Sequence, residues 1–154
     1  TSTILIPTTV SPFHITAGRV PNDYLIAVTR DAASLMLNRH PHDTNYFKEN
    51  MLRLVDPVIH DEMSATMDED EAENRWKAGR RNWMPIEICR LSGDELVTEV
   101  VGDLETYLNG VRTTNEKVVK RFTWTLSGTR LFLSDVTNIE FGRHECARIK
   151  DKTL

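Results

Sequence analysis

The spacing of apolar residues changes once along the chain, and this change constrains the fold more than any other feature. Up to about Arg81, apolar residues recur at intervals of three and four, which is typical of amphipathic helices. After Arg81 they alternate with polar residues, which is typical of strands with one buried face. One block of helices followed by one block of strands indicates the α+β class. We therefore expect helices packed on one curved antiparallel sheet of about four strands.

Three helices are predicted in the first block. The first spans residues 21–40 and ends at His40-Pro41, and a shorter second helix begins at residue 43 or 44. The third runs from Pro57 towards Arg81, with Asp56 as its N-cap. Pro57 suits the first helical position because the N–H that proline lacks has no partner there in any helix.

Turn signals divide the second block into strands. The first strand carries the apolar stripe Met84, Ile86 and Ile88. Asn109-Gly110 predicts a hairpin, because both residues tolerate the positive φ angles of a type I′ turn. A turn at Ser127-Gly128 would place large apolar residues opposite each other on one face, with Trp124 facing Leu131 and Phe122 facing Leu133.

The register of the Asn109-Gly110 hairpin predicts a bulge. A two-residue loop sets Val100 opposite Val119, whose neighbour on that face is Arg121. One inserted residue removes this conflict. Gly102 is the expected site, because glycine inside a strand often marks a bulge, and a bulge also bends the strand.

Composition and length indicate one folded domain. The 154 residues are 40% hydrophobic and 27% charged, which is ordinary for a globular protein. We expect an extended arm over residues 1–20, a single α+β domain over residues 21–141 and a polar tail over residues 142–154. The net charge of −4 argues against direct nucleic-acid binding, which relies on clustered cations.

No motif predicts a cofactor, a metal or a nucleotide. The glycines form neither a GxGxxG nor a P-loop pattern, and no Gly-x-Ser-x-Gly elbow presents a nucleophile. His40-Pro41-His42 lacks a carboxylate or cysteine at ligand spacing, so we interpret it as a connection between helices.

Four residues are candidates for acid or base chemistry if an apolar pocket raised their pKa values: Tyr24, Glu99, Asp103 and Tyr107. Glu99, Asp103 and Glu105 lie on the strand face opposite the apolar stripe of Leu96, Val100 and Leu104. A solvated outer face explains these carboxylates without catalysis.

Tryptophans and cysteines carry two further expectations. Trp124 is predicted in the core, whereas Trp76 and Trp83 are candidate partner contacts, since Trp83 precedes the stripe that begins at Met84 and so lies on the opposite face. Cys89 and Cys146 are the only cysteines. We expect no bridge that the fold requires, because Cys146 falls in the polar tail.

Short motifs in both halves of the chain together resemble those of one known family. The C-terminal half contains the segment from Val101 to Gly110, then Phe122-Thr123-Trp124 and the segment from Gly128 to Leu133. The N-terminal half contains the pairs Ile6-Pro7 and Pro12-Phe13 and the runs Asp23-Tyr24-Leu25 and Leu54-Val55-Asp56-Pro57. By the order and spacing of these motifs, the chain resembles the TraE family of conjugative pilus-assembly proteins over about residues 4–141.

The resemblance implies a non-enzymatic scaffold subunit of a type IV secretion system, related to the VirB-type inner-membrane subunit and its nuclear-transport-factor-like cone. It implies weak self-association, contacts with other secretion subunits, and a periplasmic domain anchored in the bacterial inner membrane by an N-terminal helix that precedes this chain. The Asn-Pro loop of the VirB-type relatives has no counterpart here. Because the same fold also hosts isomerases and dehydratases, a small-molecule enzyme with a polar cone pocket remains the alternative.

Overall fold

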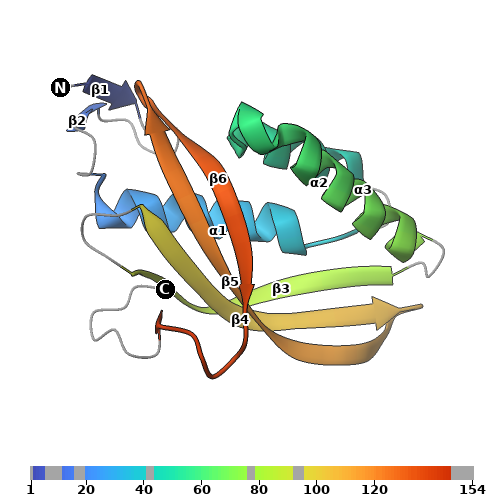
Figure 1. Cartoon of the computed structure of the whole chain (residues 1–154). Coiled ribbons are helices and arrows are strands. Elements are labelled where there is room, and N and C mark those ends of the chain that lie inside the picture. The colour runs from blue at the N-terminus through green and yellow to red at the C-terminus, as the bar shows by residue number, and fades with distance from the viewer. Residues whose placement is uncertain are drawn as a thin grey trace.

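The computed structural model describes residues 2–5, 12–15, 20–40, 44–75, 79–91 and 96–146. Within them, helices pack on one face of a curved four-stranded antiparallel sheet (Figure 1), so the expected α+β class is confirmed. The helices are α1 (Asn22–Leu37), α2 (Thr44–Leu54), the 3-10 helix η1 (Pro57–Ile59) and α3 (His60–Arg75). The strands β3 (Gly79–Arg90), β4 (Val97–Leu108), β5 (Val111–Ser127) and β6 (Arg130–Ile139) neighbour one another in chain order. Near the N-terminus, β1 (Ser2–Leu5) and β2 (Pro12–Ile15) pair with each other.

The third helical segment begins at Pro57 as predicted, with η1 leading into α3, but it ends earlier than expected. The Asp56 carboxylate accepts a hydrogen bond from the Val58 N–H at 2.9 Å, which confirms its role as N-cap. Arg81 belongs to β3 rather than to a helix. Its N–H and carbonyl both pair with the backbone of Arg39, and β3 pairs with β4 along its length. The chain therefore enters the sheet before the predicted end of the third helix.

The main core lies between α1, α2 and the concave face of the sheet. Leu25, Met51, Ile88, Phe122 and Leu133 are completely buried there, and Trp124 is 4% exposed. The prediction that Trp124 is a core residue is confirmed.

The turn at Asn109-Gly110 is confirmed, but the inserted residue is not at Gly102. Both turn residues have positive φ (53° and 80°), and Leu108 pairs with Val111 across the two-residue loop. The register shifts at Thr113, which is the extra residue on β5. A second shift inserts Ile86 on β3, directly beside the Gly102 pairing. Sequence spacing revealed that a bulge was needed, but could not tell which partner strand carries it.

Gly102 serves a different purpose, because the Trp83 side chain crosses it. A Cβ atom at this position would lie 2.5 Å from the Met84 carbonyl oxygen and 2.5 Å from the Trp83 ring. Gly102 is not among the glycines with positive φ. The glycine is therefore required by close approach rather than by backbone conformation.

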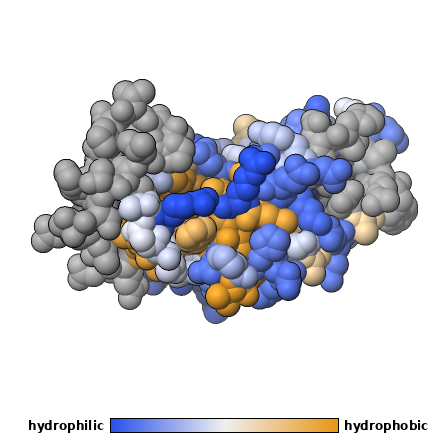
Figure 2. All heavy atoms as spheres, turned by 90° about the horizontal axis from the view of Figure 1, so that it is seen from above, coloured by the Kyte–Doolittle hydropathy of each residue, from blue (hydrophilic) through white to orange (hydrophobic). Residues whose placement is uncertain are grey.

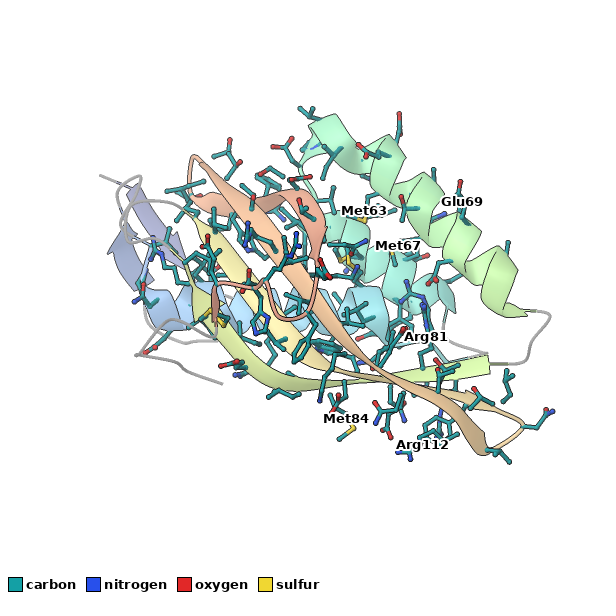
Figure 3. The ribbon with its side chains drawn as sticks, turned by 60° about the horizontal axis from the view of Figure 1, so that its bottom comes forward. Met63, Met67, Glu69, Arg81, Met84 and Arg112 are labelled. Carbon is teal, nitrogen blue, oxygen red and sulfur yellow. A yellow bond between two sulfur atoms is a disulfide. The ribbon has the colours of Figure 1, made fainter. Side chains whose placement is uncertain are left out.

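The bulge at Ile86 also reverses the predicted face of the first half of β3. Trp83 is 6% exposed and packs in the core, whereas Met84 is 51% exposed on the other face. Figure 3 shows Met84 projecting away from the helices. The placement of Trp83 on the outer face was wrong, because a single inserted residue shifts the alternation by one.

The loop of the second hairpin lies one residue later than the predicted Ser127-Gly128, which moves each strand partner by two residues. Ser127 pairs with Arg130, so the loop is Gly128-Thr129, with φ of 61° at Gly128. Trp124 consequently faces Leu133, and Phe122 faces Val136. The predicted pairs were wrong by two or three residues, yet the apolar residues remain on the core face.

Residues 141–146, which we call the C-terminal hook, fold back on the outer face of the sheet. Cys146 is bonded to Cys89, and both pack with Val101 and Val119 in a second small core. We expected no bridge that the fold requires; a bridge does form, and it fixes the segment that the sequence suggested was a free polar tail. The carboxylate of Glu99 explains the docking, because it accepts the Cys146 N–H at 2.7 Å and pairs with Arg121 at 2.9 Å.

Replacing Gly102 by alanine should destabilise the protein by about 1–3 kcal/mol, because the new methyl group overpacks the Trp83 contact. Urea denaturation of both proteins gives the difference. In a Trp83→Leu background the same substitution should cost less, since the ring is gone. An unchanged denaturation midpoint in the native background would show that β3 moves away freely.

Removing the bond between Cys89 and Cys146 should destabilise the protein by about 4 kcal/mol, because it closes a long loop in the unfolded chain. The two cysteines are 57 residues apart in the sequence, and this separation sets the length of the loop. Thermal melts with and without a reductant measure the change. The double variant Cys89→Ser, Cys146→Ser is the control, and reductant should leave its melting temperature unchanged. Equal melting temperatures of oxidised and reduced native protein would show that the hook docks without the bond.

Candidate functional site

The four acid or base candidates from the sequence do not meet in one place. Glu99, Asp103 and Tyr107 follow one another along β4, so the first and last are roughly 26 Å apart along the strand. Asp103 pairs with Lys117 at 2.6 Å. The Tyr107 ring lies under the guanidinium of Arg80, at 4.9 Å from the ring centre. These contacts are those of a structured outer face.

Glu99 differs from the solvated carboxylate that we expected. It lies on the predicted face of its strand, but it is fully buried beneath the C-terminal hook. Both carboxylate oxygens have donors, from the Cys146 N–H and from Arg121. A carboxylate enclosed in this way anchors structure and is closed to a substrate.

Tyr24 lies on α1 at the edge of the core. Burial raises the pKa of its phenol above the usual value, and the positive charge of Arg130 opposes part of that rise. A phenol with a raised pKa holds its proton at neutral pH. It is therefore a poor general base.

The interior of the cone contains one polar network, and its donors and acceptors are matched. The hydroxyl groups of Thr29 and Thr98 lie 2.7 Å apart, and Trp124 Nε1 donates to them at 3.1 and 3.3 Å. Thr29 also donates to the Leu25 carbonyl, the residue four positions earlier on α1. The network joins α1 to β4 and β5, and its polar atoms bond to one another or to the Leu25 carbonyl.

A groove between α3 and β6 is the best candidate for a functional site. We call it the α3–β6 groove, and its volume is about 180 Å³. It is lined by Met36, Ile59, Glu62, Met63, Thr66, Lys120, Asp135, Val136 and Asn138. Figure 2 looks down on this side of the molecule and shows apolar atoms gathered at its middle, with hydrophilic residues around them. Apolar floor and polar rim together are typical of binding surfaces.

Two arginines converge on one carboxylate behind the groove. Asp70 of α3 accepts hydrogen bonds from Arg39, at 2.9 Å, and from Arg81. In Figure 3, Arg81 lies beneath Met63 and Met67, on the sheet-facing side of α3, while Glu69 points away. Arg81 Nε and Trp83 Nε1 are buried and have no hydrogen-bond acceptor among the described residues.

Lys120 places a cation on the wall of the groove, which the carboxylates of Glu62 and Asp135 also line. Burial lowers the pKa of its ammonium group, the charge of Arg81 lowers it further, and that of Asp70 opposes the change. Its Nζ donates to the Asn138 side chain. The sequence contained the signal, because Lys120 interrupts the inward stripe of Val118, Phe122 and Trp124.

Metal and membrane sites were also sought within the described ranges. Cys89, Glu99 and Cys146 form the one cluster of potential ligand atoms there, and its two sulfurs are bonded to each other. His60 lies at the exposed start of α3 and His144 stacks on Phe141. Trp76 and His42 lie outside the described residues. Of the described helices, none has the length and apolar character needed to cross a membrane.

Solved structures share this fold at very low sequence identity. A TrwG component of a type IV secretion system from Bartonella birtlesii superimposes with a TM-score of 0.63 and 8% identity, covering 73% of this chain and 88% of that one. The VirB8 protein of Agrobacterium tumefaciens gives 0.61 and 9%, covering 82% and 94%. The putative transfer protein TraH of the Gram-positive conjugative plasmid pIP501 gives 0.59 and 10%, covering 82% and 99%.

The likeness to VirB8 shows that the cone of helices and sheet is the nuclear-transport-factor-like fold expected from the sequence. No curated protein sequence matches the chain significantly. The family model described as TraE protein, in contrast, matches residues 1–138. Since this match spans nearly all of the α+β domain, the chain belongs to the TraE family.

Proposed function

We propose that this chain is a non-enzymatic scaffold subunit of a conjugative type IV secretion system, which takes part in pilus assembly and DNA transfer through protein contacts. The observation that carries the proposal is the TraE family match over residues 1–138. The fold supports it, because TrwG is named as a component of a type IV secretion system and TraH as a putative transfer protein.

Packing of the interior favours binding over catalysis. An isomerase or dehydratase on this fold would need convergent polar groups in an open cone. Here Phe122, Leu25 and Met51 fill the space between α1 and the sheet, and the Thr29 network has matched partners. Three of the four acid and base candidates are spread along β4, and Tyr24 lies on α1. Geometry rather than chemistry is the proposed means of action.

The proposed location is the periplasmic face of the bacterial inner membrane, with an N-terminal helix before this chain as the anchor. Such an anchor confines the domains to a plane and raises their effective concentration. Weak contacts between copies, and with other secretion subunits, then suffice in the assembled machine. Trp76 stays a proposed contact residue, whereas Trp83 is excluded as a direct contact because it is buried.

Deleting the gene should reduce plasmid transfer between cells by several orders of magnitude, because a missing scaffold subunit stops assembly. A full-length copy expressed in trans should restore transfer, and mating assays measure both effects. A copy with Gly102→Val, which is expected to destabilise the domain, should restore it poorly. Normal transfer by the deletion strain would contradict the proposed role.

The 154-residue chain should associate reversibly with itself at high concentration and lack hydrolase, isomerase and nucleotide-dependent activity. Sedimentation over a wide concentration range measures the association. Trp76→Ala should weaken it without lowering the melting temperature much, if that residue lies in the contact. Turnover of a small substrate by a chain that stays monomeric at millimolar concentration would favour the enzyme alternative instead.

A further inference from the structure

We propose that the disulfide between Cys89 and Cys146 is a redox latch. While it is closed, it holds the C-terminal hook on the outer face of the sheet. When a dithiol reduces it, the hook leaves that face and uncovers Glu99. The inference goes beyond the proposed scaffold role and depends on none of its partners. It follows from how the hook is attached, from the charge beneath it and from the pairing of the strands that it covers.

The hook is attached to the sheet through its last residue. Cys146 is bonded to Cys89 of β3, and its N–H donates to the Glu99 carboxylate of β4 at 2.7 Å. The other hydrogen bonds that the structure describes for the hook stay within it or end at the neighbouring Glu140. Breaking the disulfide therefore removes the one covalent tie at the point where the hook meets the sheet.

Most of the hook is exposed to solvent. Phe141 is 52% exposed, and Gly142, Arg143 and Glu145 are exposed as well. His144 is buried, but its ring stacks on Phe141 of the hook itself, with 5.1 Å between the ring centres. Ordering a segment costs conformational entropy at every residue, and a hydrogen bond with a few buried side chains returns only part of it. We therefore expect the covalent bond, rather than the contacts, to keep the hook in place.

The charge under the hook favours its release. Glu99 is completely buried, whereas the side chain of its partner Arg121 is 30% exposed. When the hook leaves, water can hydrate the carboxylate oxygen that accepted the Cys146 N–H, and the pair with Arg121 at 2.9 Å is kept. Since removing a charge from water is unfavourable, uncovering Glu99 recovers hydration that docking takes away.

The strands beneath the hook pair without its help. Glu99 of β4 lies between Cys89 and Arg121 in the backbone ladders, and Val101 pairs with Val119. The main core packs on the other face of these strands. In Figure 1 the hook lies below the sheet, opposite α2 and α3. Reduction should therefore change one surface of the domain and leave its fold intact.

The opening step is a thiol–disulfide exchange. A thiolate of the dithiol attacks one sulfur of the bond, forms a mixed disulfide with it and releases the other cysteine, which takes up a proton. The second thiol of the reductant then closes its own disulfide and frees the first cysteine as a thiol. The dithiol is oxidised by two electrons and the protein is reduced by the same two. An oxidising disulfide reverses the sequence and closes the latch.

The state of the latch follows the compartment. Disulfides persist in the periplasm, whereas thiols in the cytosol are kept reduced. At the proposed periplasmic location the latch is closed, and in the cytosol, where the chain is made, the hook is free. Docking of the hook is then a late step, completed after the domain has reached its location.

Hydrogen exchange of the native 154-residue chain, followed by NMR, tests the latch. Dithiothreitol is the probe, because a small dithiol is best suited to reach the sulfurs of two buried residues. It should speed exchange of the Cys146 amide by about a hundredfold or more, since this amide loses its protection when it leaves the Glu99 carboxylate. The circular dichroism of the sheet should stay unchanged at room temperature. Reoxidation with glutathione disulfide should restore slow exchange.

The double variant Cys89→Ser, Cys146→Ser is the matched control. Its amide at position 146 should exchange quickly with or without dithiothreitol, which separates the latch from a general effect of the reductant. A Cys146 amide that stays protected after thiol titration has shown full reduction means that contacts alone dock the hook, and it overturns the latch. Loss of the circular dichroism of the sheet on reduction makes the bond a requirement of the whole fold and overturns the latch as well. Both results leave the scaffold role untouched, because mating assays test that role separately.

Discussion

The carboxylate of Asp70 is the interaction on which the helical half of the domain depends. It lies on α3 and binds Arg39, just after α1, and Arg81 on β3. Among the described side chains of α3, only Met63 and Met67 are buried apolar residues, so apolar packing alone secures this helix weakly. Arg39 and Arg81 are also joined through their backbones. Three segments far apart in sequence therefore meet at one carboxylate. This contact fixes the position of α3 beside the sheet, and with it the α3–β6 groove.

A comparable role on the other face of the sheet belongs to Glu99. Its burial would be unfavourable if it were unpaired, because a charge removed from water must be compensated. Arg121 and the Cys146 N–H supply that compensation and draw the C-terminal hook onto the sheet. The sheet is thus covered on one face by helices and, at one end of the other face, by the hook. This second cover explains why a carboxylate on a nominally polar face is inaccessible.

The curvature of the sheet affects both of its faces. Ile86 is an extra residue in β3, and its presence allows both Trp83 and Ile88 to face the core. The Trp83 ring then lies across Gly102, where any side chain would collide with it. A bulged strand bends more than a regular one, and the bend forms the concave surface that receives α1. The same bend directs the inward-facing lysine of β5, Lys120, towards the open end between α3 and β6.

Local signals in the sequence determined the class of fold, the order of the elements, the Asp56 cap and the Asn109-Gly110 turn, because each depends on neighbouring residues alone. The TraE family was likewise recognisable from the order of short motifs along the chain. Only the tertiary structure decided where the bulges lie, which face Trp83 occupies and that Cys89 meets Cys146. These depend on pairing between distant strands, where one inserted residue reverses every side chain beyond it. The groove could not be predicted for the same reason: Lys120, Asp70 and Arg39 come from separate elements, and no spacing in the sequence records their proximity.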